Sequence, residues 1–289
     1  MDKSEARKFQ MSQLMLLKYF DGFCRENQLT YFLVFGTLLG AIRHKGFIPW
    51  DVDIDVAMYR NDYEKVCKLM MNQPNQSLFF EHYKNEKNHI SPHAILRING
   101  THVNFANYSL MKHSPKNDGI YIDIFPIDNV DNPDITETER MKRITLLRRI
   151  VYHKTALILR QDHSVLHKIK KIIISVLLSP FSYKYLNAKT DLIMQEDNKK
   201  ETDVVGILTD PPVYRKQLFP RSVFGDGRQC DFEGYRFVIP EDAEMFLSIR
   251  YGDYKKLPPE DERWEIIEKA IDSVDYGNNT FLEGLEALL

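Results

Sequence analysis

One acidic motif has the residue types and spacing of a metal site. Residues 50–56 read WDVDIDV, with acidic and apolar residues in alternation. A β-strand here would place Asp51, Asp53 and Asp55 on one face and the apolar residues on the other. Carboxylates so close together repel one another, and a bound divalent cation removes that conflict. The spacing therefore predicts a metal site for Mg²⁺, with Mn²⁺ as the other candidate ion, and Asp53 and Asp55 as the paired ligands.

A third acid and a glycine-threonine pair would complete such a site. Asp123 lies alone in the apolar strand expected over residues 120–125, and a buried carboxylate needs a partner such as a shared metal. Gly36 and Thr37 precede a short helix expected over residues 38–43, whose free N–H groups could hold a phosphate. Phosphoryl and nucleotidyl transfer both use a metal ion bound beside a phosphate group. We expect Asp123 to complete the metal site or to act as general base.

Four basic residues are further candidates for substrate binding. Arg43, His44 and Lys45 follow the short helix closely and could contact a diphosphate, or they could form an exposed basic turn. Arg97, in a strand expected over residues 94–98, could reach phosphate or form a surface ion pair. Both interpretations stay open for each of the four.

Several residues near these motifs have two interpretations. Trp50 could face a quaternary ammonium group through a cation–π contact, or it could serve the core or the turn at Pro49. His89 and His93 have a spacing that suggests a metal site, but without a neighbouring cysteine we interpret them as ordinary histidines. Asp128 could lie near the site or begin the loop that follows its strand.

The elements that must position these residues mix helices with strands. Helices are expected over 4–26, 62–71 with Asp62 as N-cap, much of 137–200, and 240–250 with Pro240 in the first turn. Strands are expected over 94–98, 103–106, 120–125 and 232–238, with a hairpin turn at Asn99-Gly100. The fold class is therefore α+β. We expect one unit over 1–289, with a catalytic core (1–136), a helical insertion (137–200) and C-terminal strands and helices (201–289).

Composition narrows the choice of partners. The formal net charge is −2, so no basic excess favours nucleic acid. The three cysteines show no CxxC spacing, and neither a signal peptide nor a spanning helix is expected, which predicts a cytoplasmic protein.

Lys and Arg far outnumber Asp and Glu between residues 139 and 171. That segment could be a solvated helix surface, or it could meet an anionic membrane or a phosphorylated acceptor.

Long motifs give the sequence a family resemblance. They are FGTLLGAIRHKGFIPWDVDID over 35–55, DIFPID over 123–128, FEG over 232–234 and YGDYKKLPPE over 251–260. Together they resemble the LicD family, which is related to fukutin. The resemblance implies a nucleotidyltransferase-like mixed β-sheet flanked by helices, with Asp53, Asp55 and Asp123 as its metal-binding acids. Relatives usually have three consecutive aspartates after the tryptophan, where this chain has Val52.

The resemblance also implies a reaction. Such proteins transfer a substituted phosphate, typically phosphocholine from CDP-choline, to a cell-surface glycan. The leading hypothesis is a CDP-alcohol donor, a glycan or lipid-linked glycan acceptor, release of CMP, and peripheral contact with the inner face of the membrane. One alternative is a nucleotidyltransferase that moves NMP from an NTP and releases pyrophosphate. Another is a non-catalytic scaffold in glycan assembly, against which the intact Asp53, Asp55 and Asp123 argue.

Overall fold

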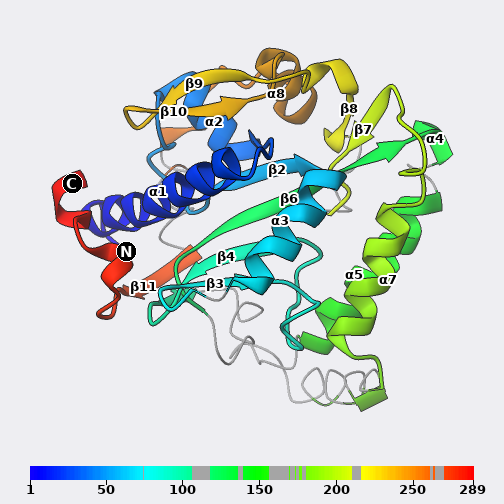
Figure 1. The fold of residues 1–289 in the computed structure, drawn as a ribbon, viewed down its shortest axis with the longest axis horizontal. Helices are drawn as coiled ribbons and strands as arrows, with labels where there is room; N and C mark the ends of the chain where they lie inside the picture. Colours follow the sequence, from blue (N-terminus) through cyan, green and yellow to red (C-terminus); the bar gives the residue numbers. More distant parts are fainter. Residues whose placement is uncertain are drawn as a thin grey trace.

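The computed structural model describes residues 1–73, 75–105, 118–135, 139–155, 169, 173, 176–177, 180–209, 216–260, 263 and 270–289. Helices and strands both contribute to the fold, as the α+β expectation requires (Figure 1). The helices are α1 (Lys3–Glu26), α2 (Phe35–His44), α3 (Arg60–Asn72), α4 (Pro133–Ile135), α5 (Met141–Thr155), α7 (Tyr183–Met194) and α8 (Ala243–Tyr251). The strands are β1 (Phe32–Leu33), β2 (Asp55–Tyr59), β3 (Leu78–Glu81), β4 (Ala94–Ile98), β5 (His102–Phe105), β6 (Tyr121–Val130), β7 (Val204–Gly206), β8 (Leu218–Pro220), β9 (Arg228–Phe232), β10 (Tyr235–Ile239) and β11 (Ile271–Asp275).

A mixed sheet forms the centre of the molecule. Among the described residues it has seven strands, in the order β1-β2-β6-β4-β3, with β7 paired to β6 and β8 to β7. The strands β2 and β6 are parallel and align Asp55 with Asp123, while β4 is antiparallel to β6. Val56 and Ile124, which alternate with the acids, are buried in the main core. The sheet therefore presents the two acids on one face and core residues on the other.

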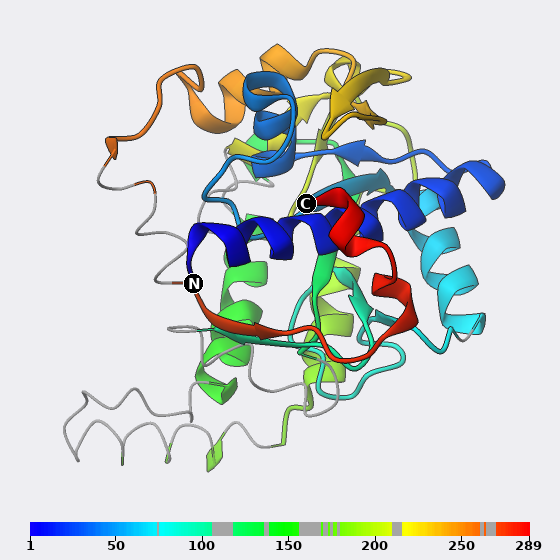
Figure 2. The same ribbon diagram turned by 90° about the vertical axis from the view of Figure 1, so that its left-hand side faces the viewer.

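Helix α1 packs on this sheet and holds the chain before β2. Its N-cap Asp2 makes a capping box with Glu5, and its apolar side chains are buried in the core. Two buried glutamines interrupt that apolar side. Gln10 Nε2 donates to the carbonyl oxygens of Ile48 and Asp51, at 3.1 Å each. Figure 2 shows the C-terminal segment beside α1, where Lys8 pairs with Glu286.

The FEG motif connects α1 to the turn between β9 and β10. Both carboxylate oxygens of Glu233 accept hydrogen bonds from Arg7, at 2.9 and 2.6 Å. Glu233 Oε1 also accepts from the backbone N of Phe47 at 2.9 Å. A Cβ at Gly46 would lie only 2.2 Å from that oxygen. The motif thus fixes the start of the loop that leads to the aspartates.

Several expected elements are confirmed. The N-terminal helix and the 94–98 strand appear with nearly the expected bounds, whereas the 232–238 segment contains the end of β9, a turn at 233–234 and most of β10. The 137–200 segment contains α5 and α7, and most of 156–179 lies outside the described residues, as do 261–262 and 264–269 of the acidic end. The division into three parts remains a prediction.

Other expectations about local structure were wrong. Helix α3 begins at Arg60 rather than at an Asp62 N-cap, because the carboxylate of Asp62 instead accepts from the backbone N of Thr30. Helix α8 begins at Ala243, after an Asp242 N-cap, so its first residue lies three positions beyond Pro240. The residues Asn99-Gly100 do form a turn, but β5 pairs with β11 and not with β4, so no hairpin results. The long-range pairing of β5 with β11 therefore replaced the local pairing that the turn predicted.

A buried ionic cluster fastens the helical insertion to the sheet. Arg60 donates to both carboxylate oxygens of Asp128 and to Asp191 of α7, each at 2.7 Å. Tyr83 donates its hydroxyl to Asp191 at 2.8 Å. Asn198 donates to Asp128 at 2.6 Å. Asp128 is therefore a structural anchor within β6 and does not begin a loop.

The described residues contain no helix long and apolar enough to cross a membrane.

Candidate active site

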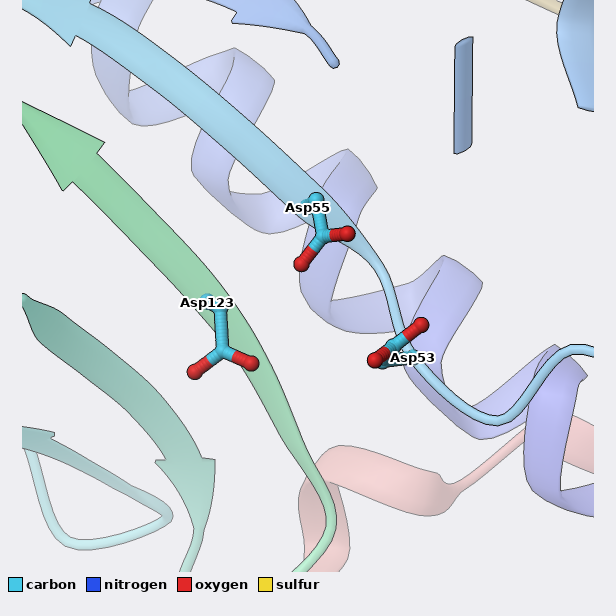
Figure 3. A group of neighbouring side chains, drawn as sticks. All are labelled: Asp53, Asp55 and Asp123. Atoms are coloured by element: carbon cyan, nitrogen blue, oxygen red, sulfur yellow. The ribbon is translucent and has the colours of Figure 1, made fainter. Parts of the chain in front are cut away.

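Three carboxylates converge at the sheet. Asp55 is the first residue of β2, Asp123 lies in β6, and Asp53 lies in the segment just before β2 (Figure 3). One oxygen from each can be chosen so that all three oxygens lie within 4.8 Å of one another. Asp55 and Asp123 are buried and Asp53 is partly buried. The structure thus brings together the three acids that the sequence predicts as metal ligands.

The segment that carries Asp51 and Asp53 is not a strand. Strand β2 begins only at Asp55, so the expected alternation over 51–55 on one strand face was wrong. Hydrogen bonds fix this segment instead. Gln13 Nε2 donates to the carbonyl oxygens of Val52 and Tyr121, at 3.1 Å each, and so ties the segment to β6. Sequence reasoning missed this role, although a glutamine on the apolar side of an amphipathic helix was the available signal.

Burial and like charge make the metal-free cluster electrostatically unfavourable. Burial, together with the carboxylates of Asp55, Asp51 and Asp123, raises the pKa of Asp53 well above its usual value. Burial and the neighbouring Asp123 and Asp51 also raise the pKa of Asp55 strongly, opposed by Arg250. For Asp51, burial raises the pKa to about 6. Such a cluster fits a divalent cation, because a cation would relieve both the burial cost and the repulsion.

The glycine-threonine pair lies beside the acids, but each residue contacts an aspartate. Helix α2 begins at Phe35, so Gly36 and Thr37 lie in its first turn rather than before it. A Cβ on Gly36 would come within 2.6 Å of Asp51 Oδ2, so the glycine makes room for that carboxylate. Thr37 Oγ1 accepts a hydrogen bond of 2.8 Å from the backbone N of Asp55. Thr37 therefore positions the first residue of β2.

The three basic residues at the end of α2 do not line the acid cleft. Arg43 Nη1 donates to the carbonyl oxygen of Tyr254 at 3.0 Å, and Arg43 lines a pocket of ≈ 380 Å³ beside the acid cleft. Neither His44 nor Lys45 is among the described residues that line this pocket or the acid cleft. Burial and the nearby Arg43 lower the pKa of His44. Only Arg43 of the three therefore borders the region of the acids.

Trp50 lines the same pocket. Its ring lies edge-on to His44, and the guanidinium of Arg263 lies 5.5 Å from the ring centre. Tyr251 and Asp51 line both this pocket and the acid cleft, so the two spaces adjoin. The YGDY motif, for which the sequence suggested no role, thus contributes to the wall between them.

Arg97 and His89 belong to a buried network. Arg97 Nε donates to Glu81 at 2.5 Å and its Nη1 donates to the carbonyl oxygen of Gly119 at 3.1 Å. His89 bonds Glu81 through Nδ1 and the carbonyl oxygen of His93 through Nε2, both at 2.8 Å. Both nitrogens of His89 are thus engaged without a metal. The Arg97 ion pair is buried rather than exposed.

His93 is a site neighbour that sequence reasoning missed. It immediately precedes β4, and its Nε2 lies 3.0 Å from Asp123 Oδ1. Its ring packs against Phe125 with centroids 4.3 Å apart. Because a carboxylate only accepts hydrogen bonds, Nε2 carries the proton and orients Asp123. Only the pairing of β4 with β6 brings these residues together, so no local pattern could reveal the contact.

A cleft of ≈ 330 Å³ surrounds the acids. Besides the aspartates it is lined by residues distant in sequence, among them Thr209, Gln217 and Arg250. Thr209 and Gln217 both lie in the connection between β7 and β8, and Arg250 lies near the end of α8. Sequence reasoning also missed these three. The one available signal was that Arg250 directly precedes the YGDY motif.

Comparisons with known proteins show which families and proteins this chain resembles. Residues 28–157, which include all three acids, match the family described as LicD/FKTN/FKRP, nucleotidyltransferase domain. The chain is 29% identical over 266 residues to the lipopolysaccharide cholinephosphotransferase LicD of Haemophilus influenzae, covering 91% of this chain and 96% of that protein. An uncharacterized protein of Rickettsia typhi is 37% identical over 57 residues, 20% of this chain and 18% of that protein. Residues 28–157 are thus similar to the LicD family domain, and the similarity to one LicD protein extends over nearly the whole chain.

Proposed function

We propose that this protein transfers phosphocholine from CDP-choline to a hydroxyl of a glycan such as that of lipopolysaccharide, and releases CMP. The observation that carries the proposal is the convergence of Asp53, Asp55 and Asp123 in one cleft. The similarity to a lipopolysaccharide cholinephosphotransferase over 91% of the chain supports the choice of group and acceptor. We also infer that the sheet carrying these acids is a nucleotidyltransferase-like fold.

The donor set suits Mg²⁺, with Mn²⁺ as the alternative. Asp53, Asp55 and Asp123 offer only carboxylate oxygens, which hard divalent cations prefer. When bound, such an ion neutralises charge that develops on the diphosphate during transfer. The acids themselves would hold the ion, and Thr37 and Gln13 hold the backbone that carries or adjoins them. The valine at position 52 leaves the three proposed metal-binding acids intact. Val52 supports the site through its backbone carbonyl oxygen, which accepts from Gln13, and not through its side chain.

The reaction exchanges one phosphorus–oxygen bond for another. The acceptor oxygen forms a bond to the choline-bearing phosphorus, and the bond from that phosphorus to the bridging oxygen breaks. CMP leaves with the bridging oxygen and both of its bonding electrons. The hydroxyl proton passes to a carboxylate oxygen, which we assign to Asp123 because His93 already orients this group.

The test is product analysis with a purified acceptor glycolipid. CDP-choline and Mg²⁺ should yield CMP, measured by anion-exchange chromatography, and phosphocholine on the acceptor, measured by phosphorus NMR. Asp53→Asn should abolish both products, whereas Asp226→Asn, at an exposed aspartate outside the cleft, should leave them unchanged. Pyrophosphate released from CTP would instead identify a nucleotidyltransferase. No product from either donor, with no stabilisation by Mg²⁺, would favour the scaffold hypothesis.

We also propose a peripheral contact between helices α5 and α7 and the inner, anionic face of a membrane. Helix α5 carries several of the basic residues of 139–171, and both helices expose large apolar side chains. The exposed apolar residues are Leu146, Tyr152, Tyr185 and Leu192. The protein should sediment with phosphatidylglycerol vesicles but not with phosphatidylcholine vesicles, and added salt should weaken binding. Leu146→Ser with Leu192→Ser should reduce it, and equal sedimentation with both vesicles would contradict the proposal.

A further inference from the structure

Two residues that line the acid cleft but lie outside the LicD family match each have a hydrogen-bond donor without a partner among the described residues. Thr209 and Arg250 both line the space that contains Asp53, Asp55 and Asp123. They come from the C-terminal third of the chain, outside residues 28–157. In each residue one buried polar atom, Thr209 Oγ1 or Arg250 Nη1, has no hydrogen-bond partner among the described residues, although the Arg250 side chain also interacts with Tyr251.

Thr209 presents a hydroxyl that the fold does not use. The residue follows β7 and is only 5% exposed. Within the described part of the chain, its Oγ1 is buried and has no hydrogen-bond partner. A buried hydroxyl without a partner destabilises the folded state, so such groups are uncommon unless a ligand or water satisfies them.

Arg250 presents a second unused donor. Its guanidinium carbon lies 4.7 Å from the centre of the Phe35 ring, a cation–π contact that fixes the group at the start of α2. Its Nη1 is buried and also lacks a partner among the residues the structure describes. The guanidinium lies close enough to Asp55 to oppose the rise in the pKa of that carboxyl. Arg250 is therefore a cation held in an acidic cleft with a free N–H.

The chemistry of these two donors selects an anion with acceptor oxygens. Arginine can only donate hydrogen bonds, and the free hydroxyl of Thr209 can donate as well. The carboxylates that line the same cleft would repel a bare anion, so an anion should bind only together with a divalent cation. A metal-complexed phosphate group satisfies both conditions. The first turn of α2 is less suited, because the Asp51 carboxylate lies against Gly36 and the Asp55 N–H binds Thr37.

We propose that Thr209 Oγ1 and Arg250 Nη1 bind phosphate oxygens of the donor's diphosphate in the cleft that also contains the three acids. The inference rests on the proposed function for the identity of the donor, but its chemistry requires only a metal-bound diphosphate. Inorganic pyrophosphate with Mg²⁺ is therefore a probe that does not depend on the nucleotide or on choline.

The experiment measures binding by calorimetry, with Mg²⁺ present, for pyrophosphate and for CDP-choline. Thr209→Val and Arg250→Gln should each weaken pyrophosphate binding about tenfold or more, the usual effect of losing a hydrogen bond to a charged group. Thr209→Ser keeps the hydroxyl and should bind as the wild type does. Thr190→Val is the matched control, since that buried hydroxyl donates to Leu186 within α7.

Thermal stability without ligand separates a binding role from a structural one. Thr209→Val replaces an unpartnered hydroxyl with a methyl group of similar shape, so its melting temperature should stay equal or rise while affinity falls. A structural hydroxyl would lower both. Wild-type affinity for pyrophosphate in both Thr209→Val and Arg250→Gln would overturn the inference.

The two probes also distinguish this inference from the proposed function. If the wild type binds pyrophosphate but not CDP-choline, the proposed donor is wrong and the phosphate subsite stands. If CDP-choline binds equally to the wild type and to both variants, the donor stands and the subsite is wrong.

Discussion

Asp55 and Asp123 are register partners on neighbouring parallel strands. Strands β2 and β6 pair so that these two residues lie directly side by side, and their side chains leave the same face of the sheet. Backbone hydrogen bonding thus forces two carboxylates together at a buried position. Asp53 joins them from the segment just before β2. The fold therefore maintains a repulsive arrangement that a cation would relieve.

Substituting Asp53 by Asn should stabilise the metal-free protein. Burial and three neighbouring carboxylates raise the pKa of Asp53, so its ionised form is less favourable in the folded chain than in the unfolded chain. With EDTA present at pH 7, the free energy of unfolding should rise by about 1 kcal/mol or more. Mg²⁺ should raise the melting temperature of the wild type but not that of the variant. Denaturant unfolding and thermal melts measure the two effects.

The stabilisation by Asp53→Asn should depend on pH. For an acid whose folded pKa is raised, the folded chain binds more protons between the unfolded and folded pKa values, so stability falls as pH rises through that window. The advantage of the variant should therefore be absent below about pH 4, where the unfolded group is also protonated, and should grow above it. An advantage that is constant across this range would refute the electrostatic explanation.

Replacing Thr37 by Val should destabilise the protein without removing any charged group. Thr37 Oγ1 accepts the N–H of Asp55, and valine would leave that buried donor without a partner. The expected cost is about 1–3 kcal/mol of unfolding free energy, measured with denaturant. Thr37→Ser keeps the acceptor and should recover most of the loss. If Thr37→Val is as stable as the wild type, the hydrogen bond does not hold the start of β2.

The sequence patterns predicted the helices, strands and buried faces that depend on residues near one another along the chain. The amphipathic period of α1 and the apolar run around Asp123 each specify an element and a buried face, and both are confirmed. The alternation over residues 50–56 and the lone acid in the apolar run over 120–125 indicated the three acids, and the family motifs contain the same residues. The pairing of β2 with β6 then converts that pattern into a cluster.

Features that depend on long-range pairing were not predictable in this way. His93 reaches Asp123 only through the pairing of β4 with β6, and Thr209 and Arg250 enter the cleft from residues far along the chain. The expected β4–β5 hairpin failed for the same reason, because β11 supplies the partner of β5. Local propensity cannot choose between two partners for one short strand.

Removing the Asp128 carboxylate should destabilise the fold strongly and leave the metal cluster intact. Asp128→Ala would remove two charge-assisted hydrogen bonds from the buried guanidinium of Arg60 and leave Asp191 as its remaining buried carboxylate partner. The expected loss is about 3–5 kcal/mol of unfolding free energy. Asp131→Ala is the control, because that residue pairs with Lys200 at the surface and should cost at most about 1 kcal/mol. Mg²⁺ affinity measured by calorimetry on folded Asp128→Ala should match that of the wild type, and a loss of affinity would place Asp128 in the metal site.

Replacing His93 by Phe should slow catalysis through Asp123. Phenylalanine can keep the packing against Phe125 but loses the Nε2 donor that lies 3.0 Å from Asp123 Oδ1. Because partners that orient metal-binding or proton-accepting groups typically contribute ten- to hundredfold, kcat should fall by about that factor. The Mg²⁺ concentration for half-maximal activity should rise, while the KM for the donor should change little. His102→Phe, at an exposed histidine paired with Asp118, is the matched control and should leave both values unchanged. A wild-type kcat and Mg²⁺ dependence in His93→Phe would mean that Asp123 is oriented by the strand alone.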